Sequence, residues 1–194
     1  PEMIGVGGNV KAVNDCRIRS GKMIEQRVPW KPLVIFQVLE YTRAFMIGRV
    51  GWASLRALPL ISGAFGVFRR EAVIELGGYK KSALGEDMDL VLRFYKHYSA
   101  MGKHCLFGFV PEAICWTEVP ETLKVLRRQR VRWHRGLLEC LSWYRGLLFN
   151  RKVGALGLLA MPFQFLFEAL SPVAEIVGYF VIIASLSTGV MSYD

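Results

Sequence analysis

The chain has 194 residues, a formal net charge of +9 and a hydrophobic content of 53%. Intrinsic disorder is excluded, because this much apolar surface can form a core. A basic soluble protein that binds nucleic acid rarely has so apolar a C-terminal region, and we expect no nucleic-acid partner. A cytoplasmic domain beside an anionic membrane surface fits both the charge and the apolar content.

The sequence starts at Pro1 and enters an apolar run at Met3, without the basic region of a signal peptide. We interpret it as the C-terminal part of a longer protein, with one domain (1–150) and a membrane-associated appendage (151–194). The four cysteines show neither a C-x-x-C pair nor zinc-site spacing with histidine, so we expect free, reduced thiols.

The first elements are predicted from hydrophobic pattern and turn residues. Residues 4–13 are apolar and Gly-rich and predict a strand that leads into a loop, but they lack a dinucleotide-binding fingerprint. The polar and basic residues 17–32, which end in Pro29-Trp30-Lys31-Pro32, predict a linker or loop. Residues 33–52 predict an amphipathic helix that either packs on the core or lies at the bilayer surface, and we expect the core contact.

Residues 60–70 predict a strand whose first half carries small side chains, Ser62 and Gly63 among them. These small residues allow either a bulky ligand or a tightly packed neighbouring strand to approach the backbone. A short helix over 71–76 is predicted to stop at Gly77-Gly78.

The stretch Gly85-Glu86-Asp87-Met88-Asp89 begins an apolar-periodic helix. Acids in a first helical turn are ordinary, because the helix dipole favours them there. The functional interpretation is that one carboxylate, fixed by the helix start, acts as a general base in a cleft. Downstream, residues 104–110 predict a strand, 111–113 a turn, and Pro120-Glu121-Thr122 the start of a basic helix.

That basic helix carries Gln129-Arg130-Val131-Arg132-Trp133. Gln129, Arg132 and Trp133 are spaced to share one helical face. An amide and a guanidinium can bind diphosphate or sugar hydroxyl oxygens, and an indole can pack on a sugar ring. The alternative is a solvated basic helix with one buried tryptophan.

Lysine and arginine are absent between Val153 and Val190, and Arg151-Lys152 stand directly before this segment. The positive-inside bias then predicts a cytoplasmic location for the preceding domain. We expect an interfacial helix over 156–170 and a membrane-spanning helix over 173–186. Gln164, Glu168, Ser171 and Glu175 share one helical face, and we hypothesise that its carboxylates face protein or water.

In this order, the motifs resemble those of the processive membrane glycosyltransferases of family 2, such as cellulose, chitin, hyaluronan and poly-N-acetylglucosamine synthases. The matching blocks cover nearly the whole chain: Ser62–Gly66 through Arg69-Arg70, Gly77-Gly78-Tyr79, Gly85-Glu86-Asp87, Pro111-Glu112, Pro120-Glu121-Thr122 and Gln129-x-x-Arg132-Trp133. The resemblance implies an α/β fold, the C-terminal half of a Rossmann-like GT-A domain, followed by interfacial and transmembrane helices.

The resemblance also implies an inverting hexosyltransferase that moves a sugar from a nucleotide-sugar, expected to be a UDP-sugar, onto a growing polysaccharide. Asp87 is implied as the base, with Glu86 supporting it or positioning the acceptor. Gln129 and Arg132 are implied to contact the donor diphosphate, Trp133 to support the acceptor sugar, and the segment from Ser62 and Gly63 to Phe65 to border the acceptor pocket.

The family uses Mg²⁺ or Mn²⁺, but the main ligands belong to a part of the domain before Pro1, so the isolated chain is expected to be inactive. Asp87-Met88-Asp89 lies in the base motif and is not assigned to the metal. Possible partners are a polysaccharide or lipid-linked acceptor, the bilayer and accessory membrane subunits of a multi-pass protein. Alternatives are a transferase acting on a lipid carrier, a membrane-anchored basic binding module and an inactive scaffold.

Overall fold

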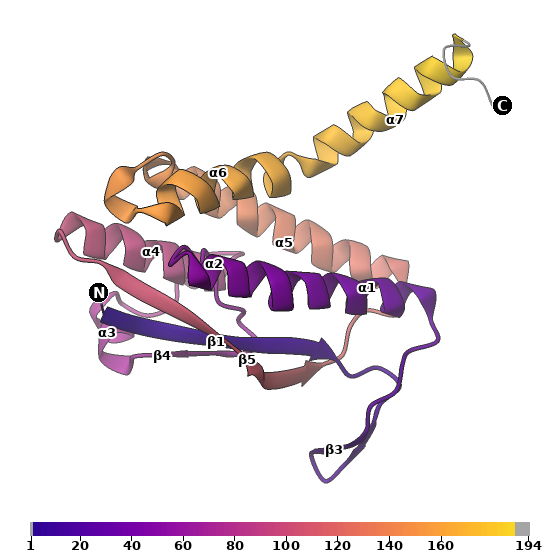
Figure 1. The fold of residues 1–194 in the computed structure, drawn as a ribbon, viewed down its shortest axis with the longest axis horizontal. Coiled ribbons are helices and arrows are strands. Elements are labelled where there is room, and N and C mark those ends of the chain that lie inside the picture. The colour runs from indigo at the N-terminus through magenta and orange to yellow at the C-terminus, as the bar shows by residue number, and fades with distance from the viewer. Residues whose placement is uncertain (1, 189–194) are drawn as a thin grey trace.

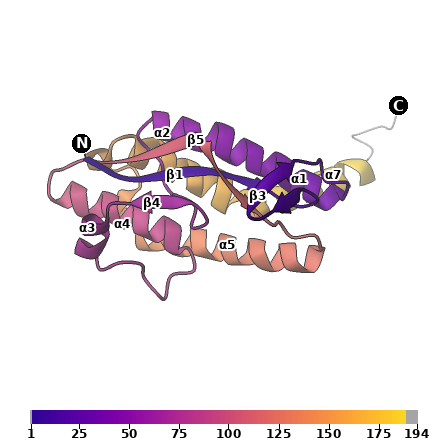
Figure 2. The same cartoon turned by 90° about the horizontal axis from the view of Figure 1, so that it is seen from below.

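The computed structural model describes residues 2–188, which form a mixed α/β arrangement of stacked layers (Figures 1 and 2). In Figure 1 a sheet lies below the helices α1 (Pro32–Thr42), α2 (Val50–Ser54) and α4 (Glu86–Ala100), and a hairpin projects below the sheet. Above these helices lie α5 (Leu123–Trp143) and α6 (Met161–Phe163), and the last helix, α7 (Ser171–Ser187), extends away from the rest of the molecule. The α/β class predicted from the sequence is confirmed.

The helices and strands are bounded as follows in chain order: β1 (Glu2–Ala12), β2 (Arg17–Arg19), β3 (Lys22–Glu25), α1 (Pro32–Thr42), α2 (Val50–Ser54), β4 (Gly66–Phe68), α3 (Arg70–Glu75), α4 (Glu86–Ala100), β5 (Cys105–Thr117), α5 (Leu123–Trp143), α6 (Met161–Phe163) and α7 (Ser171–Ser187). Three π-helical segments adjoin these helices, at Arg43–Arg49, Leu156–Ala160 and Gln164–Ala169. Two 3₁₀ turns follow α5, at Arg145–Leu147 and Arg151–Val153.

The strand predicted over 4–13 is β1, which lies at the centre of a three-stranded sheet of order β4-β1-β5. It pairs antiparallel with β4 and parallel with β5. Its glycines admit aromatic rings: a Cβ on Gly5 would lie 2.6 Å from the ring of Phe68, and one on Gly8 would lie 2.3 Å from the ring of Phe65. Tight packing therefore explains these two glycines.

The turn predicted at 111–113 is wrong, because β5 continues through it. The β1–β5 register moves from Gly8 opposite Val110 to Asn9 opposite Ile114, so the intervening residues of β5 form an irregular bulge. A bulge accommodates Pro111, which has no backbone N–H to donate. Asn9 Nδ2 donates to the Pro111 carbonyl at 3.4 Å and fixes the bulge to the central strand.

The linker predicted over 17–32 is wrong in its first part, where β2 and β3 form a hairpin. Its turn residues Ser20 and Gly21 have φ of +51° and +73°. Positive φ at both central positions is the geometry that joins two-residue hairpins. The pattern was missed because the two strands have only three and four residues, too few to show a period.

The strand predicted over 60–70 is reduced to β4, and residues 62–65 form a turn instead, in which the Phe65 N–H donates to the Ser62 carbonyl at 3.0 Å. Arg49 binds the Leu60 carbonyl and Asp87 binds the Gly63 amide, so side chains satisfy backbone groups that a strand would pair. The helix predicted over 71–76 is α3, and it stops before Gly77 and Gly78, whose φ values are +78° and +75°.

The predicted helix 33–52 is present as α1, the π-helical segment Arg43–Arg49 and α2. Val34 and Phe45 are buried, and the Phe45 ring lies 6.3 Å from Phe109 of the sheet, so the expected core contact is confirmed. On the same sheet, the Phe107 ring lies 5.9 Å from Phe94 and 5.3 Å from Tyr95 of α4.

The C-terminal apolar segment forms two helical stretches, Leu156–Ala169 and Ser171–Ser187, which meet at a bend of 44°. Within residues 2–188, neither stretch alone is long and apolar enough to cross a bilayer, whereas the bent pair together satisfies the length and composition criteria. The helix boundaries agree with the predicted 156–170 and 173–186, and the membrane crossing itself stays a prediction.

Candidate functional site

Asp87 lies in the first turn of α4, where two backbone amides hold its carboxylate. The Gly63 N–H donates to Oδ2 at 3.3 Å, and the Met88 N–H donates to Oδ1 at 2.9 Å. Asp87 is partly buried, whereas its neighbour Glu86 is exposed. The carboxylate is thus fixed in direction while it stays within reach of a ligand.

The turn that contains Ser62 and Gly63 lies directly against Asp87. A Cβ on Gly63 would meet Asp87 Cβ at 3.8 Å, and no other heavy atom except Asp87 Oδ2 lies within 4 Å of that position. The sequence allowed two explanations for the small residues. Tight packing explains Gly66, where a Cβ would lie 2.5 Å from Ile61. At Gly63, in contrast, the space beside the Asp87 carboxylate is open.

Asp89 differs from Asp87, because it is fully buried and its carboxylate has partners inside the protein. Tyr144 Oη donates to Oδ1 at 2.7 Å, and an Arg93 guanidinium nitrogen lies 3.1 Å from Oδ2. Burial, with the hydrogen bond to Asp89, raises the pKa of Tyr144. Arg93 also donates to the carbonyls of Leu76 and Gly78, so Asp89 joins α4 to α5 and to the end of α3.

The metal that the family resemblance implies does not fit the residues that the structure describes. Asp89 is committed to Arg93 and Tyr144, so Asp87-Met88-Asp89 cannot offer two free carboxylates. Between residues 2 and 188, no group of three or more His, Cys, Asp or Glu side chains is placed to bind a metal ion. We therefore derive no chemistry at Asp87 through a metal.

The start of α4 packs against α5 through two glycines. A Cβ on Gly136 would lie 2.8 Å from the nitrogen and 3.0 Å from the Cα of Gly85. Next to this contact, Cys140 Sγ lies 3.5 Å from the Gly85 carbonyl oxygen, and Glu139 accepts from the Leu84 N–H at 2.9 Å. Because all of these partners are close to Asp87 in sequence, α5 determines where that carboxylate lies.

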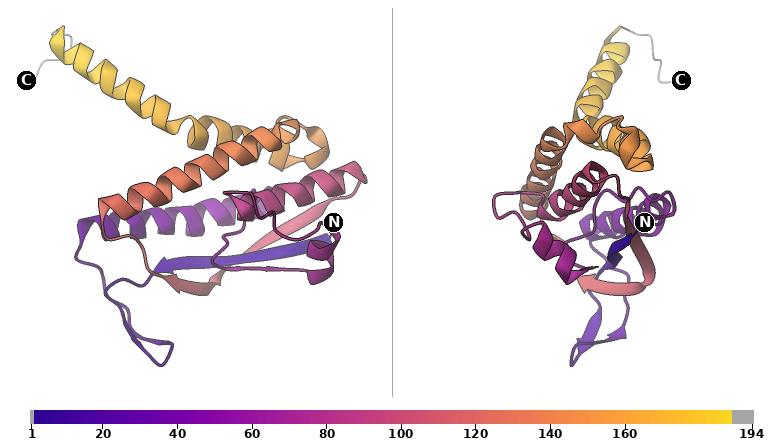
Figure 3. Two further views of the ribbon diagram at one scale, coloured as in Figure 1. Left: turned by 180° about the vertical axis from the view of Figure 1, so that it is seen from behind. Right: turned by 90° about the vertical axis from the view of Figure 1, so that its left-hand side faces the viewer.

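The stretch from Gln129 to Trp133 precedes this glycine contact on α5. At 1.5 Å per residue, Arg132 lies roughly 6 Å and Gln129 roughly 10 Å along the helix from Gly136. Figure 3 shows α5 extending past the start of α4, so this stretch lies beyond the turn that holds Asp87. The structure therefore places the two motifs at the same end of α4.

The motif side chains differ in their surroundings. Arg132 is exposed, and 42% of Trp133 is exposed. The amide oxygen of Gln129 is buried and has no hydrogen-bond partner. An unused buried acceptor costs about 1–3 kcal/mol, so the position of the Gln129 side chain carries an energetic cost.

Arg130 is a site-supporting residue that the sequence analysis did not identify. Its guanidinium forms a two-pronged ion pair with Glu40 of α1 and lies 4.8 Å from the centre of the Trp133 ring. A cation over an indole face holds the ring in one orientation. The feature of the sequence that indicated a partner for Arg130 was Glu40, an isolated acid in the largely apolar helix α1.

Arg49 is a second residue that was missed. Its guanidinium donates to the Leu60 carbonyl at 2.6 Å and lies 5.0 Å from the Phe45 ring centre. Burial lowers the pKa of Arg49 to about 10, while the negative charges of Asp87 and Glu168 oppose this decrease. Arg49 therefore binds the segment that leads into the turn whose Gly63 amide contacts Asp87, and it places a cation near the Asp87 carboxylate.

The sequence of this chain matches known glycosyltransferases. The family model described as glycosyl transferase family group 2 matches residues 32–192. A probable glycosyltransferase, YdaM of Bacillus subtilis, is 40% identical over 89 residues, which are 46% of this chain and 19% of the relative. The poly-beta-1,6-N-acetyl-D-glucosamine synthase of Staphylococcus aureus (strain COL) is 33% identical over 109 residues, 54% of this chain and 24% of the synthase.

The alignments thus span only about a fifth to a quarter of these curated relatives. Among solved structures, a mannosyltransferase of Pyrobaculum calidifontis, PcManGT, in complex with GDP-Man and Mn²⁺ is similar to 98% of this chain and 47% of that chain. Its TM-score is 0.48 and its sequence identity is 20%.

Proposed function

Since this chain belongs to glycosyl transferase family group 2, we propose that it is the C-terminal half of a GT-A domain that transfers a sugar from a nucleotide-sugar to a polysaccharide at a membrane. The observation that carries the proposal is the position of Asp87. Two amides fix its carboxylate, and α5 packs against its helix with Gln129, Arg132 and Trp133 at the same end.

In the proposed reaction, Asp87 takes the proton from the acceptor hydroxyl. The hydroxyl oxygen then attacks the anomeric carbon of the donor as the bond to the nucleoside diphosphate breaks, and the configuration inverts. A general base contributes about 10²–10⁴-fold to rate when it lies within hydrogen-bond reach of the proton. The amides of Gly63 and Met88 each bind one oxygen of the carboxylate, so each oxygen keeps a lone pair for the acceptor proton.

The leaving diphosphate gains negative charge in the transition state, and Arg132 and Gln129 are proposed to bind it. Arg132 is exposed and has no ion-pair partner among residues 2–188, so its guanidinium is available to an anion. The Gln129 side-chain nitrogen can donate to the diphosphate. Trp133, fixed by Arg130, offers an indole surface to the acceptor sugar.

We propose that residues 151–188 hold this domain at the cytoplasmic side of a cell membrane, as part of a multi-pass protein. Support comes from Arg151-Lys152, which precede the bent apolar pair, and from the absence of lysine and arginine through Val190. Mg²⁺ or Mn²⁺ and the nucleotide base are proposed to bind outside this chain, so the chain alone should not turn over. UDP-sugars are the donors to test first.

The test uses membranes that carry the complete gene product, Mg²⁺ and a panel of labelled UDP-sugars and GDP-mannose. Asp87→Asn should lower incorporation by at least about 10²-fold, because the amide cannot accept the acceptor proton. Asp15→Asn, the same change at an exposed position in the loop before β2, is the matched control and should keep full activity. Incorporation is measured at equal expression.

The product distinguishes the proposed functions. Long labelled chains that depend on Asp87 support a processive polysaccharide synthase and identify its sugar. Label found only in a short lipid-soluble product would instead indicate that the protein transfers the sugar to a lipid carrier. Equal activity of Asp87→Asn and wild type would refute the assignment of Asp87 as the base. If charge reversal of Arg127 and Arg128 abolished function instead, a basic binding module would be favoured. No incorporation with any donor would favour an inactive scaffold.

A further inference from the structure

Helix α5 has an outer face that carries cations and apolar side chains. On the opposite side of the helix, Gly136 and Cys140 are buried inside the domain. The residues of the outer face follow one another at spacings of four and three, which places them in one row along the helix. This row, which we call the outer face of α5, consists of six exposed residues: Lys124, Arg128, Val131, Arg135, Leu138 and Ser142. At 1.5 Å per residue it extends over roughly 27 Å.

The three cations of the outer face have no acidic partner. None of Lys124, Arg128 and Arg135 forms an ion pair within the described part of the chain. The one acid in the sequence of α5, Glu139, accepts from the Leu84 N–H at 2.9 Å and is thus directed toward the loop before α4. Lys124 and Arg128 are four residues apart, a spacing at which like charges on a helix repel each other. An anionic partner would remove this repulsion.

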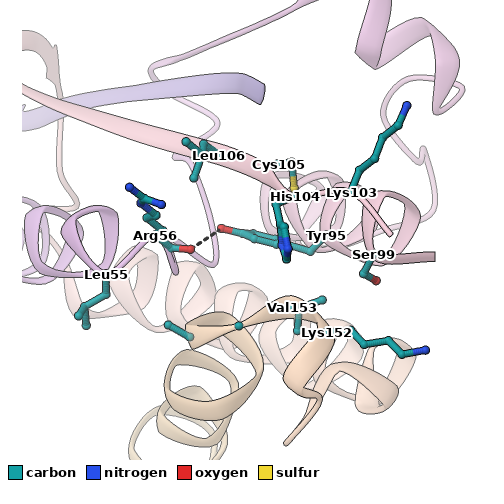
Figure 4. Close-up of a pocket in the computed structure, with 12 residues that line it drawn as sticks. Leu55, Arg56, Tyr95, Ser99, Lys103, His104, Cys105, Leu106, Lys152 and Val153 are labelled. Atoms are coloured by element: carbon teal, nitrogen blue, oxygen red, sulfur yellow. Dashed lines mark hydrogen bonds between the residues drawn. The ribbon is translucent and has the colours of Figure 1, made fainter. Parts of the chain in front are cut away.

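Cations elsewhere do not gather in this way. Figure 4 shows a cavity of about 330 Å³ between the end of α4, the start of β5 and the turn at 151–154. The charged ends of its two lysines, Lys103 and Lys152, point out of the cavity and away from each other, and its lining is mostly apolar. This cavity therefore offers no cluster of charge to an anion, whereas the outer face of α5 carries three cations in a single row.

The apolar side chains of the outer face indicate which kind of anionic partner fits it. Val131 and Leu138 lie between the cations, and their exposed fractions are 49% and 45%. The phosphates of a nucleic acid would pair with the cations but would leave these two side chains in water. The surface of an anionic bilayer matches both, because apolar side chains enter the boundary between headgroups and acyl chains while cations stay among the headgroups.

The outer face lies on the side of the molecule from which the last helix leaves. α5 contacts the π-helical segment Gln164–Ala169 of the C-terminal apolar pair. The two lie together in the upper part of Figure 1, where α7 begins, whereas the hairpin of β2 and β3 projects on the opposite side (Figures 1 and 3). Because α5 packs on α4 with its buried side, its outer face is turned away from α4 and from the sheet. It is therefore free to meet a surface that the C-terminal pair enters.

We propose that the outer face of α5 lies on the anionic cytoplasmic surface of the membrane. The proposal rests on the proposed function only in the membrane location of the C-terminal pair, and it adds a second contact, made by the catalytic domain itself. The three cations bind headgroup phosphates, and Val131 and Leu138 contact the first acyl carbons. Because the same helix carries Gln129, Arg132 and Trp133, the headgroups also fix the proposed diphosphate-binding residues relative to the membrane.

The experiment replaces Leu138 of the complete gene product by the photo-crosslinking amino acid p-benzoylphenylalanine. The protein is illuminated in vesicles of equal parts phosphatidylcholine and phosphatidylglycerol, and lipid adducts are measured by mass spectrometry. Phe167, 65% exposed in the C-terminal pair, is the positive control, and Ile18, 52% exposed in the hairpin on the opposite side, is the negative control. We expect lipid adducts at Leu138 and Phe167 and none at Ile18. Since crosslinking needs no sugar transfer, the result is independent of the proposed reaction.

A second arm tests the cations. Lys124→Gln/Arg128→Gln/Arg135→Gln should lower the yield of lipid adducts at Leu138 at least about threefold, because each cation strengthens contact with an anionic surface. The control Arg19→Gln/Lys22→Gln/Arg70→Gln removes the same charge at exposed positions away from α5 and should keep the yield. Vesicles of phosphatidylcholine alone should lower the yield with wild-type charges, which keeps the test valid should the variant not fold.

The other outcomes would overturn the proposal. Adducts at Phe167 without adducts at Leu138 would refute the contact of α5 and leave the C-terminal pair in the membrane. Adducts at neither position would refute the membrane location as well. A Leu138 adduct with a second protein chain would assign the outer face to an interface between copies, and equal yields in all vesicles and variants would show that the cations do not hold this face at the membrane.

Discussion

At the scale of single residues, the structure separates two acids that look alike in the sequence. Asp87 and Asp89 both begin α4, but the first is partly buried beside open space, and the second is fully buried with Tyr144 and Arg93. The proposed base is therefore Asp87, while Asp89 holds helices together. Burial and side-chain partners distinguish the proposed base from the structural acid, because the residue type is the same.

Asp89→Asn should lower the stability of the fold far more than it lowers the rate of sugar transfer. Removing one partner of a buried ion pair costs about 3–5 kcal/mol, because Arg93 is left without its counter-charge. For a chain of this size that corresponds to a decrease in Tm of roughly 10 °C. Thermal unfolding followed by circular dichroism checks this, with Asp15→Asn as the control, which should keep its Tm. An unchanged Tm for Asp89→Asn would show that the pair does not support the fold.

Arg49 is predicted to position the proposed base electrostatically and through the turn at Leu60. Arg49→Met keeps most of the side-chain volume but removes the cation and the hydrogen bond to the Leu60 carbonyl. We expect kcat of the complete enzyme to fall about tenfold or more with little change in KM, because misplaced catalytic groups slow the reaction.

Rescue by the conservative variant separates this role from a purely structural one. Arg49→Lys keeps the cation and should restore kcat toward the wild-type value, whereas Arg49→Met should not. A stable Arg49→Met enzyme with an unchanged kcat would contradict the positioning role.

At the scale of elements, the contact between α4 and α5 determines how the two proposed motifs meet. Gly136 touches Gly85 closely enough that any side chain meets backbone, which cannot rotate away. The residues of α5 that follow Gly136 bind α4 and the loop before it, and those that precede it carry Gln129 to Trp133. A shift between these helices therefore moves the proposed base relative to the proposed diphosphate-binding residues.

Gly136→Ala should push α5 away from α4. Its Cβ would lie 2.8 Å from the Gly85 nitrogen, so we expect a loss of about 1–3 kcal/mol, typical of overpacking, together with a decrease in activity. Gly51→Ala in α2 is the matched control, since its Cβ meets nothing within 4 Å and helix propensity favours alanine. Both are measured by thermal unfolding and sugar incorporation, and similar values for the two variants would show that the contact tolerates a methyl group.

At the scale of the whole molecule, a polar cluster joins three parts that are distant in sequence. Glu121 before α5 accepts from Asn14 at 3.1 Å and pairs with Lys31 at the start of α1. Asn14 also donates to the Val119 carbonyl at 3.0 Å and accepts from the Val119 N–H at 2.9 Å. This cluster holds the end of β1, the start of α1 and the approach to α5 together.

The cluster predicts a pH-dependent contribution to stability. Hydrogen bonds from Lys31 and Asn14 hold the pKa of Glu121 below its ordinary value of 4.5. A carboxyl group whose pKa is lowered in the folded state stabilises the fold above pH 4.5, and this contribution is lost as pH falls through the lower folded value. Glu121→Gln should therefore have a slightly lower Tm than wild type at pH 7, and the difference should shrink below pH 4.5.

Thermal unfolding of both proteins from pH 7 to pH 3 checks this. Lys22→Gln, which removes an exposed charge outside the cluster, is the control and should follow wild type throughout. A difference between Glu121→Gln and wild type that persists unchanged at pH 3 would show that the carboxylate charge is not its cause.

The sequence by itself predicted the strand over 4–13 and most helix boundaries, which depend on local pattern. The family resemblance carried by its motifs gave the α/β class and the residues proposed for chemistry. Only the tertiary structure showed that the turn at Ser62-Gly63 touches Asp87, that Asp89 is structural, and that Arg49 and Arg130 support the site. Each of these contacts joins residues far apart along the chain or depends on burial. Local pattern carries no information about such partners, because packing selects them.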